Sequence, residues 1–311
     1  MIARRLLIAI PLVFAMTFVV FSMIALIPGD AATTIAGGSD AAPETIAQIR
    51  SNLNLDEPFI VQYGLWLGDA LQFDFGESIY SQRSVAEELL VRLPVTLGLA
   101  LAVFAIVIPV GTLLGVMGGL RPGGRLDRSL MFGTSLLVAM PPFWIALLLI
   151  SVVAVSLRWL PPYGYTAFGD DPVGWLQSII MPALALAAAG VAIVSRQLRA
   201  ALADTMQSPY VRTAWAKGGD ARRVVIGHAL KNSSMPAVTV LGLLVGSILG
   251  STVIVEQIFN IPGIGSYMIT AVGNQDVPVI LAVALLFILA YIVANLLVDL
   301  TYGYLNPKVR A

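Results

Sequence analysis

Very few side chains in this sequence are suited to act as a nucleophile, a general base or a metal ligand in a shared site. His228 is the only histidine, and the chain contains no cysteine. A serine protease needs a histidine hydrogen-bonded to its serine, and a zinc site needs several histidine, cysteine or carboxylate ligands. The sequence therefore predicts no catalytic site and no metal site, and we interpret His228 as a solvated or packed loop residue.

The lysines lack the setting that a P-loop requires, in which a lysine directly after a glycine reaches the phosphates of the nucleotide. The three lysines of this chain follow Ala216, Leu230 and Pro307. No basic stretch interleaved with aromatic residues indicates a nucleic-acid surface either. We therefore expect neither a nucleotide bound in a P-loop nor nucleic acid on this chain.

A mainly polar stretch in the second half of the chain, residues 208–236, separates two long apolar runs. Ser208 followed by Pro209 predicts a helix start, because a serine side chain caps free amides and proline is tolerated at the first helical position. The helix is expected to run to Lys217.

Two glycines and an aspartate follow this expected helix. Gly218 and Gly219 predict its end, since glycine adopts the left-handed conformation of a helix C-terminus without a Cβ clash. The Asp220 carboxylate is then placed to cap a second helix, from Ala221 to about Lys231. The prediction is a helix, a glycine hinge and a second helix.

The surroundings of this stretch are those of a polytopic membrane protein. Charged residues make up 12% of the chain and apolar residues 58%, and the mean hydropathy is +0.87, against roughly 25% charged and 45–50% apolar in soluble domains. A bilayer-spanning helix needs ~20 apolar residues, whereas the apolar region of a signal peptide has only ~7–15, so the run after Arg5 is too long to be a signal peptide. Six charge-free runs are long enough to be transmembrane helices: residues 6–27, 94–120, 129–157, 172–195, 232–255 and 277–298.

The lysines and arginines predict the orientation of the six helices, because cytoplasmic loops carry an excess of both. With the N-terminus inside, 14 of the 18 basic residues fall in cytoplasmic segments. The basic residues left outside are Arg50, Arg83, Arg92 and Arg158. We therefore expect both termini on the cytoplasmic side of the membrane.

The runs divide the chain into three parts: residues 1–27 with the first helix, an extracytoplasmic segment over 28–93, and a transmembrane core over 94–311 that includes a cytoplasmic loop at 196–231. The outer segment contains amphipathic patterns that predict helices on the membrane surface, with Trp66 at the interface. A capping box at Ser84 and Glu87 predicts the start of a helix leading into the second run. The two patterns consist of Ile46, Ile49 and Leu53, and of Ile60, Tyr63, Leu67 and Leu71.

Small residues recur at every fourth position in two of the runs, and a proline pair interrupts a third. Such spacing lets helix backbones approach closely, and we interpret it as packing within the helix bundle. Pro141 and Pro142 interrupt the run 129–157, where freed carbonyl groups are tolerated in a membrane helix. The glycines are Gly111, Gly115 and Gly119 in the second run and Gly242, Gly246 and Gly250 in the fifth.

One acid stands inside the apolar runs or at their ends without being plainly extracytoplasmic. Asp299 lies four residues after Asn295, so both share one helix face. An acid in a membrane helix is by default a functional hypothesis. Its place before Lys308 and Arg310 favours an ion pair with a nearby basic residue.

Several stretches resemble one family. The spacing of RTAWAKG, from Arg212 to Gly218, followed by HAL from His228, is similar to the cytoplasmic "EAA" loop of ATP-binding-cassette (ABC) importer permeases of the peptide and nickel group, first-permease (B-type) branch. Arg212 stands where a glutamate is usual and Lys231 where a proline is usual, as in the peptide branch. The stretches LDEPFIVQYGLWL, FDFGES, SVAEELLVRLPVTLGL, IFNIPGIGSYMITAVGNQDVP and DLTYGYLNPKVR resemble the same family, so the likeness covers nearly the whole chain.

The resemblance implies an all-α, type I importer-like transmembrane domain that forms half of a pathway for di- or oligopeptides. It implies three kinds of partner: a second permease subunit, one or two ABC ATPase subunits that bind ATP and Mg²⁺, and an extracytoplasmic substrate-binding protein. The chain itself would be non-catalytic and would lie in the lipid of a bacterial cytoplasmic membrane. The residues expected to contact the ATPase are Arg212, Thr213, Ala214, Trp215, Ala216, Lys217, Gly218, Gly219 and Asp220.

Two other functions stay open at this point. A permease for nickel or another small solute would share the same motifs. An ion-coupled secondary transporter belongs to a different class, which typically has buried acids and broken helices in repeated halves. Purification with a nucleotide-binding subunit, as opposed to uptake that persists on a gradient without ATP, distinguishes this class from an ABC importer.

Overall fold

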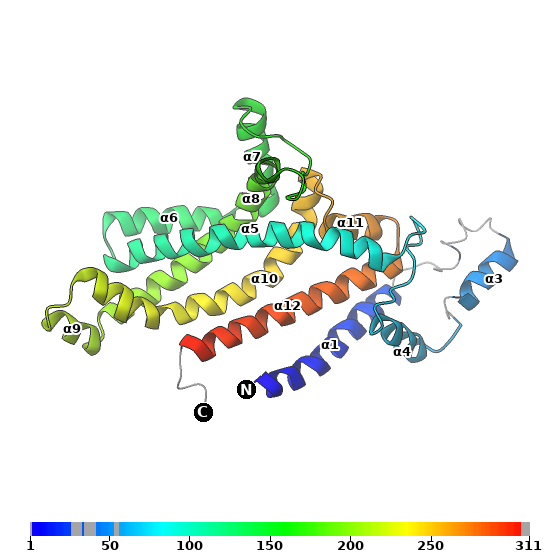
Figure 1. The fold of residues 1–311 in the computed structure, drawn as a ribbon, viewed down its shortest axis with the longest axis horizontal. Coiled ribbons are helices and arrows are strands. Elements are labelled where there is room, and N and C mark those ends of the chain that lie inside the picture. The colour runs from blue at the N-terminus through cyan, green and yellow to red at the C-terminus, as the bar shows by residue number, and fades with distance from the viewer. Residues whose placement is uncertain (1, 26–32, 34–41, 53–55, 306–311) are drawn as a thin grey trace. The chain divides into compact units, whose positions relative to one another are not determined.

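The computed structural model describes residues 2–25, 33, 42–52 and 56–305 of the chain. Within these ranges the regular structure is helical, and the only β-type pairing is an isolated bridge between Glu77 and Ser84. The elements, coloured in chain order in Figure 1, are α1 (Ile2–Ala25), α3 (Pro43–Asn52), α4 (Phe59–Ala70), α5 (Val85–Leu120), α6 (Arg125–Ala139), α7 (Pro142–Leu149), η1 (Ile150–Ser156), α8 (Pro172–Met206), α9 (Pro209–Ala216), η2 (Arg223–Leu230), α10 (Lys231–Phe259), α11 (Ile264–Gly273) and α12 (Val277–Leu305).

Four described helices are long and apolar enough to cross a membrane, and a bent pair makes a possible fifth span. The four are Val85–Leu120, Pro172–Met206, Arg223–Phe259 and Val277–Val298. They contain four of the six expected runs. The first expected span corresponds to α1. Among the described residues, its apolar part, Ile10–Met23, is shorter than a membrane-spanning helix requires.

The expected third span is two helices rather than one. The chain breaks after α6, and α6 and the pair α7–η1 are bent by 100°. Met140 and Pro141 are extended, with ψ of 123° and 145°, and Pro142 begins α7. A proline disfavours the helical conformation of the residue before it and supplies no N–H, so two in succession end α6.

The chain folds into two compact units. The larger consists of Leu93–Ser266 and Ala290–Ala311 with Met1–Ile2, and the smaller of Ala3–Arg92 and Tyr267–Leu289. The loop that joins α8 to α10 belongs to the larger unit.

Within the larger unit, α8 is the most buried helix, and three glycines of α5 pack against it. A Cβ built on Gly111 would lie 3.0 Å from the Cβ of Val194. Cβ atoms on Gly115 and Gly119 would lie 2.9 and 3.0 Å from the backbone oxygens of Ser195 and Arg199. The packing interpretation of this glycine repeat is therefore confirmed.

The second glycine repeat is used only in part. Gly242 and Gly246 of α10 face Val298 and the Tyr291 ring of α12, at 2.8 and 3.1 Å from a built Cβ. Nothing lies within 4 Å of a Cβ on Gly250. The third position of this repeat thus meets open space among the described residues.

In the smaller unit, α4 packs on α1 through aromatic rings. The Tyr63 ring lies 5.2 Å from that of Phe18, and the Trp66 ring 5.8 Å from that of Phe21. Of the expected apolar face, Ile60 and Leu71 are 65% and 73% exposed, and Leu71 lies one residue beyond α4. Trp66, expected at the membrane interface, packs beside Phe21. Helix α3 forms as expected, while the side chains of Ile46 and Ile49 lie outside the described ones and Leu53 outside the described residues.

A buried carboxylate fixes the turn before α5. Asp276 is 2% exposed, and its carboxylate accepts hydrogen bonds from the Ser78 hydroxyl (2.5 Å) and the Ile79 amide (3.1 Å). Helix α5 then begins at Val85, where the Ser84 hydroxyl accepts a bond from the Glu87 amide at 3.5 Å. The helix start expected at Ser84 is confirmed.

Candidate coupling loop between α8 and α10

The loop begins where α8 ends at Met206. Helix α9 starts at Pro209, as the sequence predicts, and ends at Ala216. The expected Ser208 side-chain cap is wrong: the Ser208 hydroxyl donates instead to the Thr205 carbonyl at 2.6 Å. Proline at the first position is sufficient to begin this helix, since it needs no amide partner.

The glycine hinge forms by two different physical means. Gly218 has a φ of +78°, the left-handed conformation that favours glycine, and its amide donates to the Trp215 carbonyl at 2.9 Å. Gly219 has no positive φ, so the expectation for it is wrong in this respect. A Cβ there would lie 2.9 Å from Val224 and 3.0 Å from the Ala214 carbonyl oxygen, so close approach excludes a side chain.

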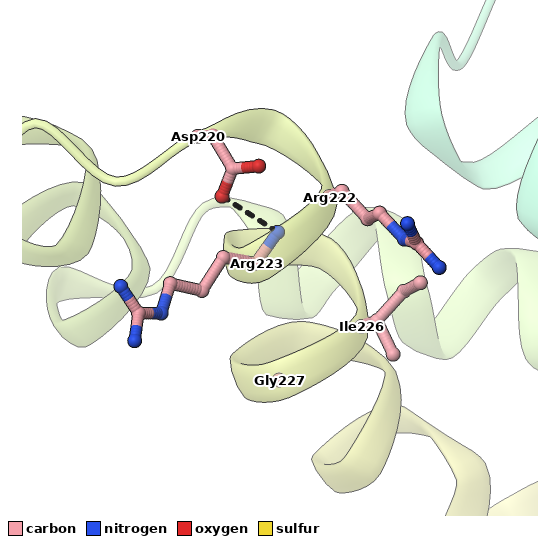
Figure 2. Close-up of a pocket in the computed structure, with 5 residues that line it drawn as sticks. All are labelled: Asp220, Arg222, Arg223, Ile226 and Gly227. Atoms are coloured by element: carbon pink, nitrogen blue, oxygen red, sulfur yellow. Dashed lines mark hydrogen bonds between the residues drawn. The ribbon is translucent and has the colours of Figure 1, made fainter.

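Asp220 caps the helix that follows, as the sequence predicts. Its Oδ1 accepts a hydrogen bond from the Arg223 amide at 3.1 Å (Figure 2). The second helix is not separate, however: it continues through the π-helical element η2 directly into α10. The expected end near Lys231 is therefore wrong, because no glycine or proline follows Gly227 until Pro236, and the helix continues.

One face of α9 packs on a small apolar core. It is formed by Leu202 of α8, Val211 of α9, and Val224 and Ala229 of η2, all four at 0–1% exposure. Ala214 of α9 packs against the same core. Three consecutive elements therefore hold one another by side chains, and α9 lies where the chain reverses between α8 and α10 (Figure 1).

The opposite face of α9 is exposed. Trp215 is 42% and Tyr210 44% exposed, and Arg212 is exposed beside them. With about 3.6 residues per turn, Arg212 and Ala216 point away from Val211 and Ala214, which face the core, and Trp215 lies at the edge between the two faces. The remaining expected contact residues that are exposed are Thr213, Ala216, Lys217, Gly218 and Asp220.

A shallow depression follows the hinge. It is lined by Asp220, Arg222, Arg223, Ile226 and Gly227, and Figure 2 shows the two arginine side chains pointing to opposite sides of their helix. His228, one residue further, is exposed. The expected contact residues are consecutive in the sequence, and the structure exposes all of them except Ala214 and Gly219.

This arrangement suits docking rather than bond-making chemistry. Among the described residues no group of three or more histidine, cysteine, aspartate or glutamate side chains is placed to hold a metal. Exposed tyrosine, tryptophan and arginine are the side chains that dominate protein interfaces. A rigid base with such a face is a candidate contact surface for another protein.

Sequence reasoning missed three buried carboxylates, those of Asp127, Asp276 and Glu256. Glu256, which directly follows the expected fifth span, is 0% exposed. Its oxygens accept hydrogen bonds from the Thr96 hydroxyl (2.8 Å) and the Ser266 amide (3.0 Å), and Thr96 in turn accepts one from the Ile264 amide (2.8 Å). The prediction that set Asp299 apart covered only acids that are not plainly extracytoplasmic, and Glu256 stands at the expected outer end of its run. The side chain of Asp299 itself lies outside the described ones.

Long apolar helices and an exposed polar hinge define a class: a multi-pass membrane protein with a surface for a partner. Residues 107–311 match the family described as binding-protein-dependent transport system inner membrane component, and residues 1–100 match the N-terminal family of such membrane components. The chain belongs to this family and is a permease subunit of the bacterial inner membrane.

Relatives match over nearly their whole lengths. One from Brucella abortus is 37% identical over 310 residues, 100% of this chain and 98% of its own. The dipeptide transport system permease protein DppB of Alkalihalophilus pseudofirmus is 35% identical, and the glutathione transport system permease protein GsiC of Escherichia coli 37%, each over 99% of this chain and 98% of the relative.

Proposed function

We propose that this chain forms half of the translocation pathway of an ATP-driven, binding-protein-dependent importer of di- or oligopeptides. Two relatives are named for a dipeptide and for glutathione, itself a tripeptide. A permease for nickel or another small solute is the second candidate. No side chain of the described spans distinguishes the two, because the substrate-binding protein is expected to select the cargo.

The topology that supports this proposal has six spans with both termini in the cytoplasm. The four long helices and the bent pair supply five of them. α1 would supply the sixth, and the distribution of arginine and lysine orients all six. In this topology α9 and the hinge face the cytoplasm, where ATP is available.

The observation that carries the proposal is the two-sided character of α9. Val211 and Ala214 fix it to a buried apolar core, Arg212 is exposed on the opposite side, and Trp215 is 42% exposed at the edge between the two. Tryptophan and arginine exposed close together are the side chain types that contribute most at protein interfaces. We infer that the residues from Arg212 to Asp220 bind an ABC ATPase subunit, which carries ATP and Mg²⁺.

Coupling then needs no covalent chemistry in this chain. Closure of the ATPase dimer on ATP would displace α9, and its core would pass the displacement to α8 and η2. The spans of this chain and of a second permease subunit would switch between inward-facing and outward-facing states. The substrate-binding protein would deliver peptide on the other side of the membrane.

The test begins with the purified complex in proteoliposomes. We expect ATPase subunits to purify with the permease, and uptake of a tritiated dipeptide to stop when ATP is omitted. Uptake that continues on an ion gradient without ATP would establish an ion-coupled transporter instead.

A matched pair of variants locates the contact. Trp215→Ala should weaken binding of the ATPase by about thirtyfold and lower the amount that co-purifies, because a tryptophan at an interface typically contributes about 2 kcal/mol. Trp159→Ala, at a position 73% exposed and far from the loop in sequence, is the control and should have no effect. Equal ATPase recovery from both variants would disprove the assignment of α9.

A further inference from the structure

An ion pair joins the start of α6 to the end of α8. Asp127 is 3% exposed, and the Arg199 guanidinium donates to it twice, from Nε to Oδ1 at 2.9 Å and from Nη2 to Oδ2 at 2.5 Å. The Gly123 amide donates a third bond to Oδ2 at 2.8 Å. Both carboxylate oxygens are thus engaged, and the planar fork fixes the orientation of one helix relative to the other.

Helix α5 closes around the same pair. A Cβ built on Gly118 would lie 3.1 Å from Asp127 Oδ1 and 3.1 Å from Arg199 Cγ. One residue on, a Cβ on Gly119 would lie 3.0 Å from the Cβ of Leu202. Three helices therefore meet at this level with little free space, and a shift of α8 here displaces both α5 and α6.

The pair stands next to the core that supports α9. Leu202, which lies three residues after Arg199 on α8, belongs to the apolar core that holds Val211 and Val224. α6 ends in the 100° bend, so it is mechanically distinct from α7 and η1. A displacement of α9 thus has a continuous path through Leu202 and Arg199 to Asp127 and α6.

An ion pair is a poor choice for stability alone at such a site. The cost of removing two charges from water often exceeds their mutual attraction, and apolar replacements are frequently as stable. A bidentate pair instead provides a defined register between two helices, which apolar contacts specify less sharply. A requirement for a fixed register between α6 and α8, rather than for stability, is the reason to consider a mechanical role for this pair.

We propose that Asp127 and Arg199 are positioning residues that transmit the movement of α9 from α8 to α6 during transport. This inference rests on the proposed function of α9 as the ATPase contact. Neither side chain touches substrate or nucleotide in this proposal. The pair acts by making α6 move together with α8.

The first test removes the bidentate geometry with little change in volume. Asp127→Asn and Arg199→Lys are reconstituted with the ATPase subunits, the second permease and the binding protein. We expect dipeptide uptake per ATP hydrolysed to fall by about fivefold or more, a typical size for a coupling free energy. ATPase co-purification should stay unchanged. The controls are Asp69→Asn and Arg125→Lys, at exposed positions.

The second test restores the link by a covalent bond. Because the chain has no cysteine, the double variant Asp127→Cys/Arg199→Cys carries the only two thiols of this subunit. We expect low uptake per ATP in the reduced protein, and recovery when a short bis-methanethiosulfonate linker joins the two positions. A purely structural ion pair predicts that the linker improves thermal stability without restoring the ratio.

The outcomes are separable. A native ratio in Asp127→Asn or Arg199→Lys, or a cross-linked protein that stays uncoupled, overturns the role of the pair while ATPase binding through α9 still stands. If the single variants do not reach the membrane, the cross-linked protein decides alone. Loss of α9's role is measured separately, by ATPase recovery from Trp215→Ala.

Discussion

The two ends of α10 carry short connecting segments that are held in opposite ways. Before α10, the hinge and α9 rest on an apolar core and expose their polar groups and rings. After α10, residues 260–266 wrap around the buried Glu256 carboxylate, and Ile261 and Ile264 are 1% and 0% exposed. The first segment has its polar groups outside, and the second has a charged group inside.

The difference indicates which segment is available to a partner. The Ser266 amide and Thr96 hydroxyl are satisfied by Glu256, so this bonding capacity of the second segment is used within the protein. In the first segment, Arg212 and Trp215 are exposed and Val211 and Ala214 bury the apolar side. The hydrogen-bonding groups of the second segment are used within the protein. The first segment is anchored by apolar contacts, so its exposed polar side chains remain accessible to a partner.

The largest expected effect is the removal of the internal carboxylate. Glu256→Ala removes the acceptor of the Thr96 hydroxyl and of the Ser266 amide, and a buried donor that loses its acceptor costs about 1–3 kcal/mol. We expect the unfolding temperature of the detergent-solubilised protein to fall by about 5 °C or more. Gln257→Ala, at the next position and exposed, is the control. Equal unfolding temperatures would show that the second segment is not held by Glu256.

The next effect tests the hinge. Gly218→Val places a β-branched residue at a φ of +78°, at about 1–2 kcal/mol or more of strain. Membrane insertion should be normal, while uptake per ATP falls by about fivefold or more. Gly133→Val, where a Cβ meets nothing within 4 Å and φ is not positive, should transport normally. Full transport by Gly218→Val would remove the hinge from the mechanism.

The smallest effect distinguishes the two helix starts of the loop. Asp220→Ala removes a cap worth about 1 kcal/mol, so the Arg223 amide should exchange its hydrogen about fivefold faster. Ser208→Ala removes no cap, and the amides of the first turn of α9 should exchange at the wild-type rate. Hydrogen exchange followed by mass spectrometry measures both, and acceleration in the Ser208 variant would contradict the observed geometry.

Much of the fold was predictable because hydrophobic length is a local property. Four of the six charge-free runs lie in helices that could cross a membrane, and the proline pair marks the break in a fifth. The helix boundaries were less predictable: α5 and α8 extend beyond their apolar runs to Val85 and Met206. Charged residues in the end turns do not stop a helix, so hydropathy alone underestimates its length.

The candidate site was predictable in its hinge and not in its support. The left-handed Gly218 and the Asp220 cap follow from the preferences of single residues, and both formed as expected. The role of Gly219 depends on the nearby Val224 side chain and Ala214 carbonyl, and the base of α9 depends on Leu202 and Ala229. Such contacts join residues whose pairing no local pattern specifies.

The sequence by itself determined an all-helical membrane protein, its main apolar spans and a glycine hinge between two of them, because these depend on hydropathy and on backbone preferences within a few residues. Only the tertiary structure decided that Glu256 and Asp127 are buried, and that they bind Thr96 and Arg199 at sequence distances of 160 and 72 residues. From sequence alone a carboxylate is expected to be exposed to solvent. It can be buried when hydrogen-bond donors from another helix lie next to it in the folded protein. The physical reason is that burial and partnership are properties of the packed chain, and no window of sequence contains both partners.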